Sequence, residues 1–102
     1  MRPRKLDGTP RVNALALLDG WTEAAGRDAI RKTFKFGDFS RAFAFLTRVA
    51  LRAEQLDHHP EWSNVYDRVE VTLSTHDAGG VTELDVALAR FIDEVARSAG
   101  AN

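Results

Sequence analysis

The longest periodic pattern in the chain, at residues 38–57, has the spacing of one face of an α-helix. Apolar residues recur in it at intervals of three and four, namely Phe39, Ala42, Phe43, Leu46, Val49, Ala50, Ala53 and Leu56. Asp38 or Ser40 is suited to cap its start, and Pro60 ends it because a residue before proline is displaced from helical dihedral angles. We therefore expect a long central helix that is buried along these positions, with Phe45 off their line.

Two further segments carry the helical spacing, one near each end of the chain. The first covers residues 10–18 and follows Thr9, a candidate N-cap. The second covers residues 82–98, and its apolar stripe consists of Leu84, Ala87, Leu88, Phe91, Ile92, Val95 and Ala96.

Two pairs of predicted strands separate these three helices. Residues 21–24 and 30–36 form one hairpin, and residues 62–65 and 69–75 form another. Apolar and polar residues alternate along the longer strands, so one face of the sheet is apolar. The order α-β-β-α-β-β-α predicts one α+β domain, with a four-stranded antiparallel sheet and three helices on one face.

Composition narrows the possible functions of this domain. The 102 residues include 14 basic and 15 acidic side chains, and a net charge of -1 does not favour nucleic acid or an anionic membrane as partner. Cysteine is absent, which excludes disulfides, thiolate metal sites and a cysteine nucleophile. Residues 1–8 are basic and no apolar stretch follows them, so we expect a flexible tail, no membrane span and a cytoplasmic location.

The candidate chemistry lies in the three histidines, His58, His59 and His76, because histidine exchanges protons near neutral pH. His58 and His59 follow the central helix, and His76 follows the last strand. Glu54 precedes His58 by four residues, so we expect its carboxylate to reach that imidazole. Neither His58 nor His76 belongs to an apolar stripe, so we expect the chain to fold without either of them.

Each of these residues also has a purely structural explanation. A pair of histidines can cap the last carbonyls of a helix, and His76 can be a solvated loop residue. A metal site is a further alternative, although adjacent histidines point in different directions and the helical His-x-x-x-His spacing is missing. Asp85 can close a capping box with Thr82, and Trp21 can be a core aromatic.

Residues 54–62, Glu-Gln-Leu-Asp-His-His-Pro-Glu-Trp, resemble the signature of the pterin-4a-carbinolamine dehydratase family. Tyr66, His76 and Asp85 match the aromatic residue, the histidine and the aspartate that follow in this signature. Similar residues occur in most of the chain from Gly20 onward, including residues 26–30, 47–51 and 73–76.

The resemblance implies dehydration of 4a-hydroxytetrahydropterin to quinonoid dihydropterin, a step of tetrahydrobiopterin recycling that requires no cofactor, metal or covalent intermediate. It assigns proton transfer to His58 and His76 and substrate binding to His59, which we also count as catalytic. It implies that Glu54 orients His58. The substrate-binding set that we expect consists of His59, Glu54, Asp57, Asp85 and Trp21.

The resemblance also implies partners. Family members are usually tetramers built from two dimers, with strands that pair across subunits. Animal members also act as dimerisation cofactors for a homeodomain transcription factor, so a helix-binding module is the alternative function, and a pterin of another pathway is a third possibility. Animal members often have a basic residue just before the aspartate, where this chain has Leu84.

Overall fold

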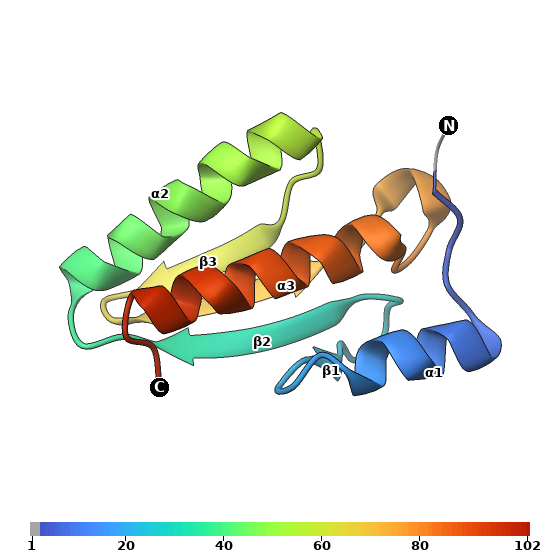
Figure 1. Cartoon of the computed structure of the whole chain (residues 1–102), viewed down its shortest axis with the longest axis horizontal. Coiled ribbons are helices and arrows are strands. Elements are labelled where there is room, and N and C mark those ends of the chain that lie inside the picture. Colours follow the sequence, from blue (N-terminus) through green and yellow to red (C-terminus); the bar gives the residue numbers. More distant parts are fainter. Residues whose placement is uncertain (1–2) are drawn as a thin grey trace.

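The computed structural model describes residues 3–102 and contains three α-helices and a four-stranded antiparallel sheet. In chain order the elements are α1 (Gly8–Ala16), β1 (Thr22–Glu23), β2 (Ile30–Lys35), α2 (Phe39–Leu56), β3 (Glu61–Val65), β4 (Arg68–Leu73), the short 3-10 helix η1 (His76–Ala78) and α3 (Glu83–Ser98). The strand order is β1-β2-β4-β3, and the helices lie on one face of the sheet (Figure 1). The predicted α+β architecture is confirmed.

The two faces of the sheet differ in polarity, as the alternation along the strands predicts. Strands β2 and β4 pair over their full length in an antiparallel register. The side chains beneath the helices are buried and form the core together with α2 and α3; they are Ile30, Phe34, Val69, Val71 and Leu73. On the opposite face Arg31 and Glu70 form an ion pair across the two strands.

The buried face of α2 differs from the predicted one. Phe45, expected off the apolar line, is fully buried, whereas Phe39 and Phe43 are 48% and 57% exposed. The ring of Phe45 packs on Phe34 and Phe36 of the sheet side, with centroid distances of 5.3 and 4.9 Å. An apolar stripe this wide cannot all face the sheet, and the helix is rotated so that Phe45 fills the core.

Helix α3 also buries a face that is rotated from its predicted stripe. Asp85, Val86 and Ala89 are buried, whereas Ala87 is exposed. Because α3 packs against α2 as well as over the sheet, its buried arc extends to positions that a single stripe does not include. Across residues 3–102, no helix is long and apolar enough to cross a membrane.

The first helix begins at Gly8, with Asp7 as its N-cap, and not at residue 10 after Thr9. Within the expected tail, Leu6 packs on the core and its N–H donates to the carbonyl of Val81 at 2.8 Å. Met1 and Arg2, the first residues of that segment, lie outside the described residues.

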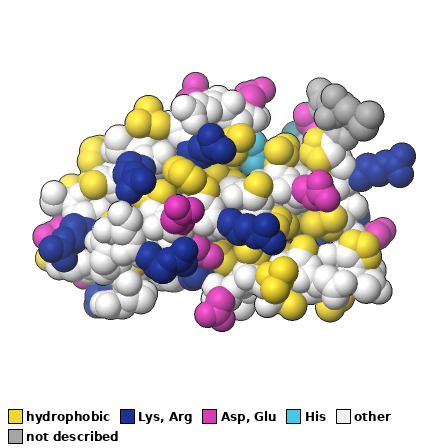
Figure 2. Space-filling model, in the orientation of Figure 1, with side chains coloured by type: hydrophobic (Ala, Val, Ile, Leu, Met, Phe, Trp, Pro, Cys, Tyr) yellow, Lys and Arg dark blue, Asp and Glu magenta, His cyan; other side chains and the backbone are white. Residues whose placement is uncertain are grey.

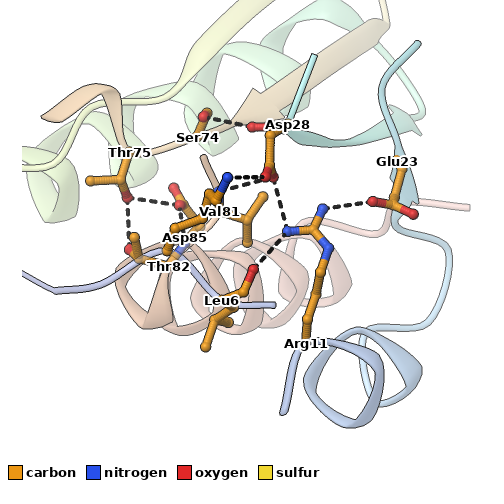
Figure 3. A network of polar contacts seen from close by, with 10 residues as sticks. Leu6, Arg11, Glu23, Asp28, Ser74, Thr75, Val81, Thr82 and Asp85 are labelled. Atoms are coloured by element: carbon orange, nitrogen blue, oxygen red, sulfur yellow. Dashed lines mark hydrogen bonds and ion pairs between the residues drawn. The ribbon is translucent and has the colours of Figure 1, made fainter. Parts of the chain in front are cut away.

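An ion-pair network attaches α1 to the rest of the fold (Figure 3). The Arg11 guanidinium donates to Asp28 at 2.9 Å and to Glu23 at 2.6 Å. Burial alone would raise the pKa of Asp28, but the N–H of Val81 and the charge of Arg11 hold this pKa below its ordinary value. The first helix is therefore attached both by these polar contacts and by Ala14 and Leu15, which pack against the core.

Candidate active site

The turn after α2 places two neighbouring histidines in different surroundings. Asp57 adopts the left-handed conformation, with φ of 51°. The N–H of Asp57 donates to the carbonyl of Glu54 at 3.2 Å, and the next N–H, of His58, donates to the carbonyl of Ala53 at 3.1 Å. These two bonds form a Schellman motif, which reverses the chain. The side chain of His58 is consequently 8% exposed and that of His59 is 54% exposed.

His58 forms a hydrogen bond with a buried carboxylate. Its Nε2 lies 2.5 Å from Oδ1 of Asp85, whose side chain is 0% exposed. An ionised carboxylate only accepts hydrogen bonds, so a neutral imidazole at this position donates from Nε2 and keeps Nδ1 as its acceptor. Within residues 3–102, Nδ1 has no hydrogen-bond partner, and it is therefore available to a ligand.

Asp85 also closes the N-terminal end of α3. Its Oδ2 accepts from the N–H of Thr82 at 2.9 Å and from the hydroxyl of Thr75 at 2.8 Å (Figure 3). Thr82 and Asp85 form the capping box that the sequence predicts. Asp85 thus caps the helix as the sequence predicts and also holds an imidazole, a contact that was expected of Glu54; its substrate-binding role stays a prediction.

Glu54 contacts His59 and not His58. Its Oε1 lies 2.6 Å from Nε2 of His59, and both side chains are exposed. The expected contact fails because His58 lies beyond the last turn of α2. The left-handed residue at position 57 interrupts the helical i, i+4 relation and turns the ring of His58 toward α3.

A cavity of about 480 Å³ brings the three histidines together. Its lining residues are Pro3, Asp57, His58, His59, Ser74, Thr75, His76, Asp77, Ala78 and Leu84. The turn after α2 contributes His58 and His59, whereas η1 contributes His76, which is exposed. On the face shown in Figure 2, histidine atoms reach the surface between the end of α2 and the start of α3. This cavity is the candidate active site.

Two aromatic residues from the sequence prediction do not line this cavity. Trp21 is 7% exposed, its ring packs on Phe34, and its indole N–H donates to Asp93 at 3.1 Å. It is therefore a core residue in this structure. Tyr66 is 65% exposed at the turn between β3 and β4, at the opposite end of β4 from His76.

Sequence reasoning missed several lining residues, of which Thr75 had a detectable signal. The apolar positions of β4 are Val69, Val71 and Leu73, so the next position on the core face is Thr75. A hydroxyl on the core side of a strand requires a buried partner, which here is Asp85. Ser74 and Asp77 gave no comparable signal because polar residues are ordinary at a loop.

The histidines are not arranged as a metal site. In the part of the chain that the structure describes, no group of three or more histidine, aspartate and glutamate side chains is placed to hold a metal ion. The absence of a metal from the reaction stays a prediction.

Leu84, at the position of the basic residue of animal proteins, lines the cavity as an apolar wall.

Comparison with known proteins identifies the family. The chain matches the model of the family Pterin 4 alpha carbinolamine dehydratase over residues 4–95. The chain belongs to the pterin-4a-carbinolamine dehydratase family. As a family member it is a hydro-lyase, and its resemblance in sequence is confirmed.

Bacterial dehydratase relatives match the chain over most of their length. A Paraburkholderia xenovorans protein with the provisional name pterin-4-alpha-carbinolamine dehydratase is 59% identical over 91 residues, which cover 89% of this chain and 95% of that protein. A Burkholderia pseudomallei protein with the same provisional name is 56% identical over 97 residues, or 95% of this chain and 96% of that protein.

Two solved structures share the dehydratase fold. A transcriptional coactivator/pterin dehydratase from Brucella melitensis has a TM-score of 0.88 and 53% identity, covering 91% of this chain and 99% of that one. A pterin dehydratase-like RuBisCO assembly factor of the alpha-carboxysome has a TM-score of 0.65 and 28% identity, covering 76% and 89%.

Proposed function

We propose that this chain dehydrates 4a-hydroxytetrahydropterin to quinonoid dihydropterin by histidine acid–base catalysis. The observation that carries the proposal is the convergence of His58, His59 and His76 on one cavity from two separate segments. The reaction requires a base for the N5 proton and an acid for the leaving 4a-hydroxyl, and imidazoles suit both tasks near neutral pH.

His58 is the proposed base. Its Nε2–H is held by Asp85, so its unprotonated Nδ1 accepts the N5 proton of the substrate. The imidazolium that results is stabilised by the carboxylate of Asp85 behind it, as in other carboxylate–histidine pairs. The electron pair of the broken N–H bond forms the double bond between N5 and C4a.

His76 is the proposed acid and His59 the proposed substrate-binding histidine. His76, in its protonated form, transfers a proton to the 4a-hydroxyl, which leaves as water. Its exposed position on η1 allows it to regain that proton from solvent. His59 is held by Glu54 at the rim of the same cavity, where its ring contacts a bound pterin.

A stopped-flow assay of 4a-hydroxytetrahydropterin breakdown tests this proposal. The protein should accelerate the reaction, and His76→Ala should reduce the rate roughly 10²–10⁴-fold. Tyr66→Phe, a change at an exposed residue outside the cavity, is the control and should leave the rate unchanged. The proposal fails if the protein does not accelerate breakdown, or if His76→Ala and Tyr66→Phe have equal rates.

The proposal places the chain in the cytoplasm, in tetrahydrobiopterin recycling, without a cofactor. The chemistry supports the absence of a cofactor, since the reaction is a proton transfer with loss of water. The substrate-binding role first expected of Trp21 finds no support in its position, because its ring lies in the core.

We further propose that the chain is a homo-oligomer, a tetramer formed by two dimers. Phe39 and Phe43 are exposed side by side on α2, with ring centroids 6.0 Å apart, and Leu51 on the same helix is 64% exposed. Strand β3 is an edge of the sheet, and open edges favour pairing with another chain. These features support contacts between subunits through α2 and through the sheet.

Light scattering at micromolar concentration tests the oligomer. Phe43→Glu, which places a charge among the exposed α2 residues, should reduce the measured mass below that of a tetramer. Val12→Glu, at a comparably exposed site on α1, should leave the mass unchanged. A stable, active monomer would refute the proposal. A transcription-factor partner, the alternative suggested by the coactivator name of the Brucella relative, would compete for the same α2 residues.

A further inference from the structure

We propose that Thr75 is a positioning residue of this enzyme. It lies at the centre of a chain of hydrogen bonds that runs from Thr82 through Thr75 to Asp85, and His58 donates to the other oxygen of the same carboxylate. This chain holds the His58 ring with its Nε2–H on Asp85 and its Nδ1 toward the cavity. Only the kinetic part of the inference rests on the proposed function.

The chain is buried and its atoms are close together. Thr75 is 7% exposed and Thr82 is 0% exposed. Their hydroxyl oxygens are 2.7 Å apart, and the hydroxyl of Thr75 lies 2.8 Å from Oδ2 of Asp85 (Figure 3). Within residues 3–102, every side-chain nitrogen and oxygen atom that is itself fully buried has a hydrogen-bond partner.

The direction of each hydrogen bond follows from the number of hydrogens. A threonine hydroxyl has one hydrogen to donate, and an ionised carboxylate has none. The hydrogen of Thr75 is therefore directed to Asp85, and Thr75 accepts from Thr82. The hydroxyl oxygen of Thr82 in turn accepts from the N–H of Leu84 at 3.2 Å. All of these hydrogens point toward the carboxylate.

This direction determines which oxygen of Asp85 serves His58. The N–H of Thr82 and the hydroxyl of Thr75 both occupy Oδ2, so the carboxylate is held by two donors on one side. Oδ1 is then aimed at Nε2 of His58. Without the hydroxyl of Thr75, Oδ2 keeps one donor, and the hydroxyl of Thr82 loses its acceptor in a buried place.

Variants at position 75 separate the hydroxyl from the shape of the side chain. Thr75→Val keeps the shape and removes the hydroxyl, whereas Thr75→Ser keeps the hydroxyl. Thr75→Val should lower kcat roughly tenfold, the loss expected for one hydrogen bond to a charged group, and leave KM within about twofold. Thr75→Ser should restore kcat. If Thr75→Val does not fold, Thr75→Cys, with a weak donor of similar size, takes its place.

Proton NMR of ¹⁵N-labelled imidazoles provides a readout that is independent of activity. The Nε2–H of His58 should give a downfield resonance protected from exchange in the native protein and in Thr75→Ser. In Thr75→Val it should shift and exchange faster. Asp85→Asn should remove it and produce an Nδ1–H, because an amide that accepts from Thr82 and Thr75 directs its NH₂ to His58.

The results distinguish this inference from the proposed function. A folded Thr75→Val protein with the native Nε2–H resonance and native kcat would overturn the positioning role. An Asp85→Asn protein that keeps the Nε2–H would overturn the assigned direction of the chain. If the native protein does not dehydrate the pterin, the proposed function fails, and the NMR comparison still decides the role of Thr75.

Discussion

Replacing His58 should destabilise the fold as well as slow the reaction, which changes the expectation from the sequence alone. His58→Ala leaves the carboxylate of Asp85 buried without one of its three hydrogen-bond donors. Leaving a buried group without a partner costs about 1–3 kcal/mol, and the cost is higher when the group is charged. Because Asp85 is a carboxylate but keeps two donors, we expect a loss of about 3 kcal/mol, the upper end of this range.

This loss is large for a domain of this size. Small domains are stable by about 5–15 kcal/mol in total. At about 4–8 °C per kcal/mol, the melting temperature of His58→Ala should fall by roughly 12–24 °C. His76→Ala is the matched control, since the same truncation at an exposed histidine should change the stability by less than about 0.5 kcal/mol.

Urea denaturation followed by circular dichroism measures the difference at one fixed protein concentration, which is necessary for an oligomer. The double variant His58→Ala/Asp85→Asn should recover part of the loss, because a neutral amide still caps α3 and leaves no buried charge. Equal urea midpoints for His58→Ala and His76→Ala would refute this account of the pair. Rates for His58→Ala are meaningful only when the folded fraction is known.

Three further predictions follow from the core, the network around α1 and the chemistry. Phe45→Ala should lower the unfolding free energy by about 3–5 kcal/mol, because Phe45 is buried in the core. Phe43→Ala should lower the unfolding free energy of the monomer much less, because Phe43 is exposed in the single chain. Similar denaturation midpoints for the two variants would contradict the rotation of α2. The lowered pKa of Asp28 stabilises the fold above the ordinary value of 3.8, and this contribution should disappear as the pH falls through the lowered pKa. The unfolding free energy of the native protein should therefore exceed that of Arg11→Met most above pH 3.8, and the difference should shrink as the pH falls below this value. Identical curves of unfolding free energy against pH would exclude this role. Dehydratase activity should persist after exhaustive chelation, and its loss with recovery on added zinc would reverse the metal prediction.

The elements of the fold were predictable from local patterns, but the rotation of each helix was not. Alternation in β4 and the caps at Asp38 and Thr82 depend on neighbouring residues, which a sequence displays directly. The burial of Phe45 depends on the space above Phe34 and Phe36, which no local spacing reveals.

The candidate site was predictable in its residue types and less so in its pairings. The three histidines do line one cavity. The predicted contact between Glu54 and His58 was wrong, because the left-handed conformation of Asp57 reverses the chain before His58. Thr75 was missed because its role depends on a carboxylate that lies ten positions further along the chain.

The capping box of α3 restricts how this protein can change. Asp85 must accept from the N–H of Thr82 to cap the start of α3 and must also accept from Nε2 of His58. A side chain with a single methylene sets both of these hydrogen-bond distances. Glutamate is longer by one methylene, and asparagine reverses one hydrogen bond. A substitution at this position therefore changes the stability of α3 and the position of the His58 ring together. A stabilised variant sought by random mutagenesis should keep Asp85 unchanged and acquire its substitutions on the polar face of the sheet and on α1.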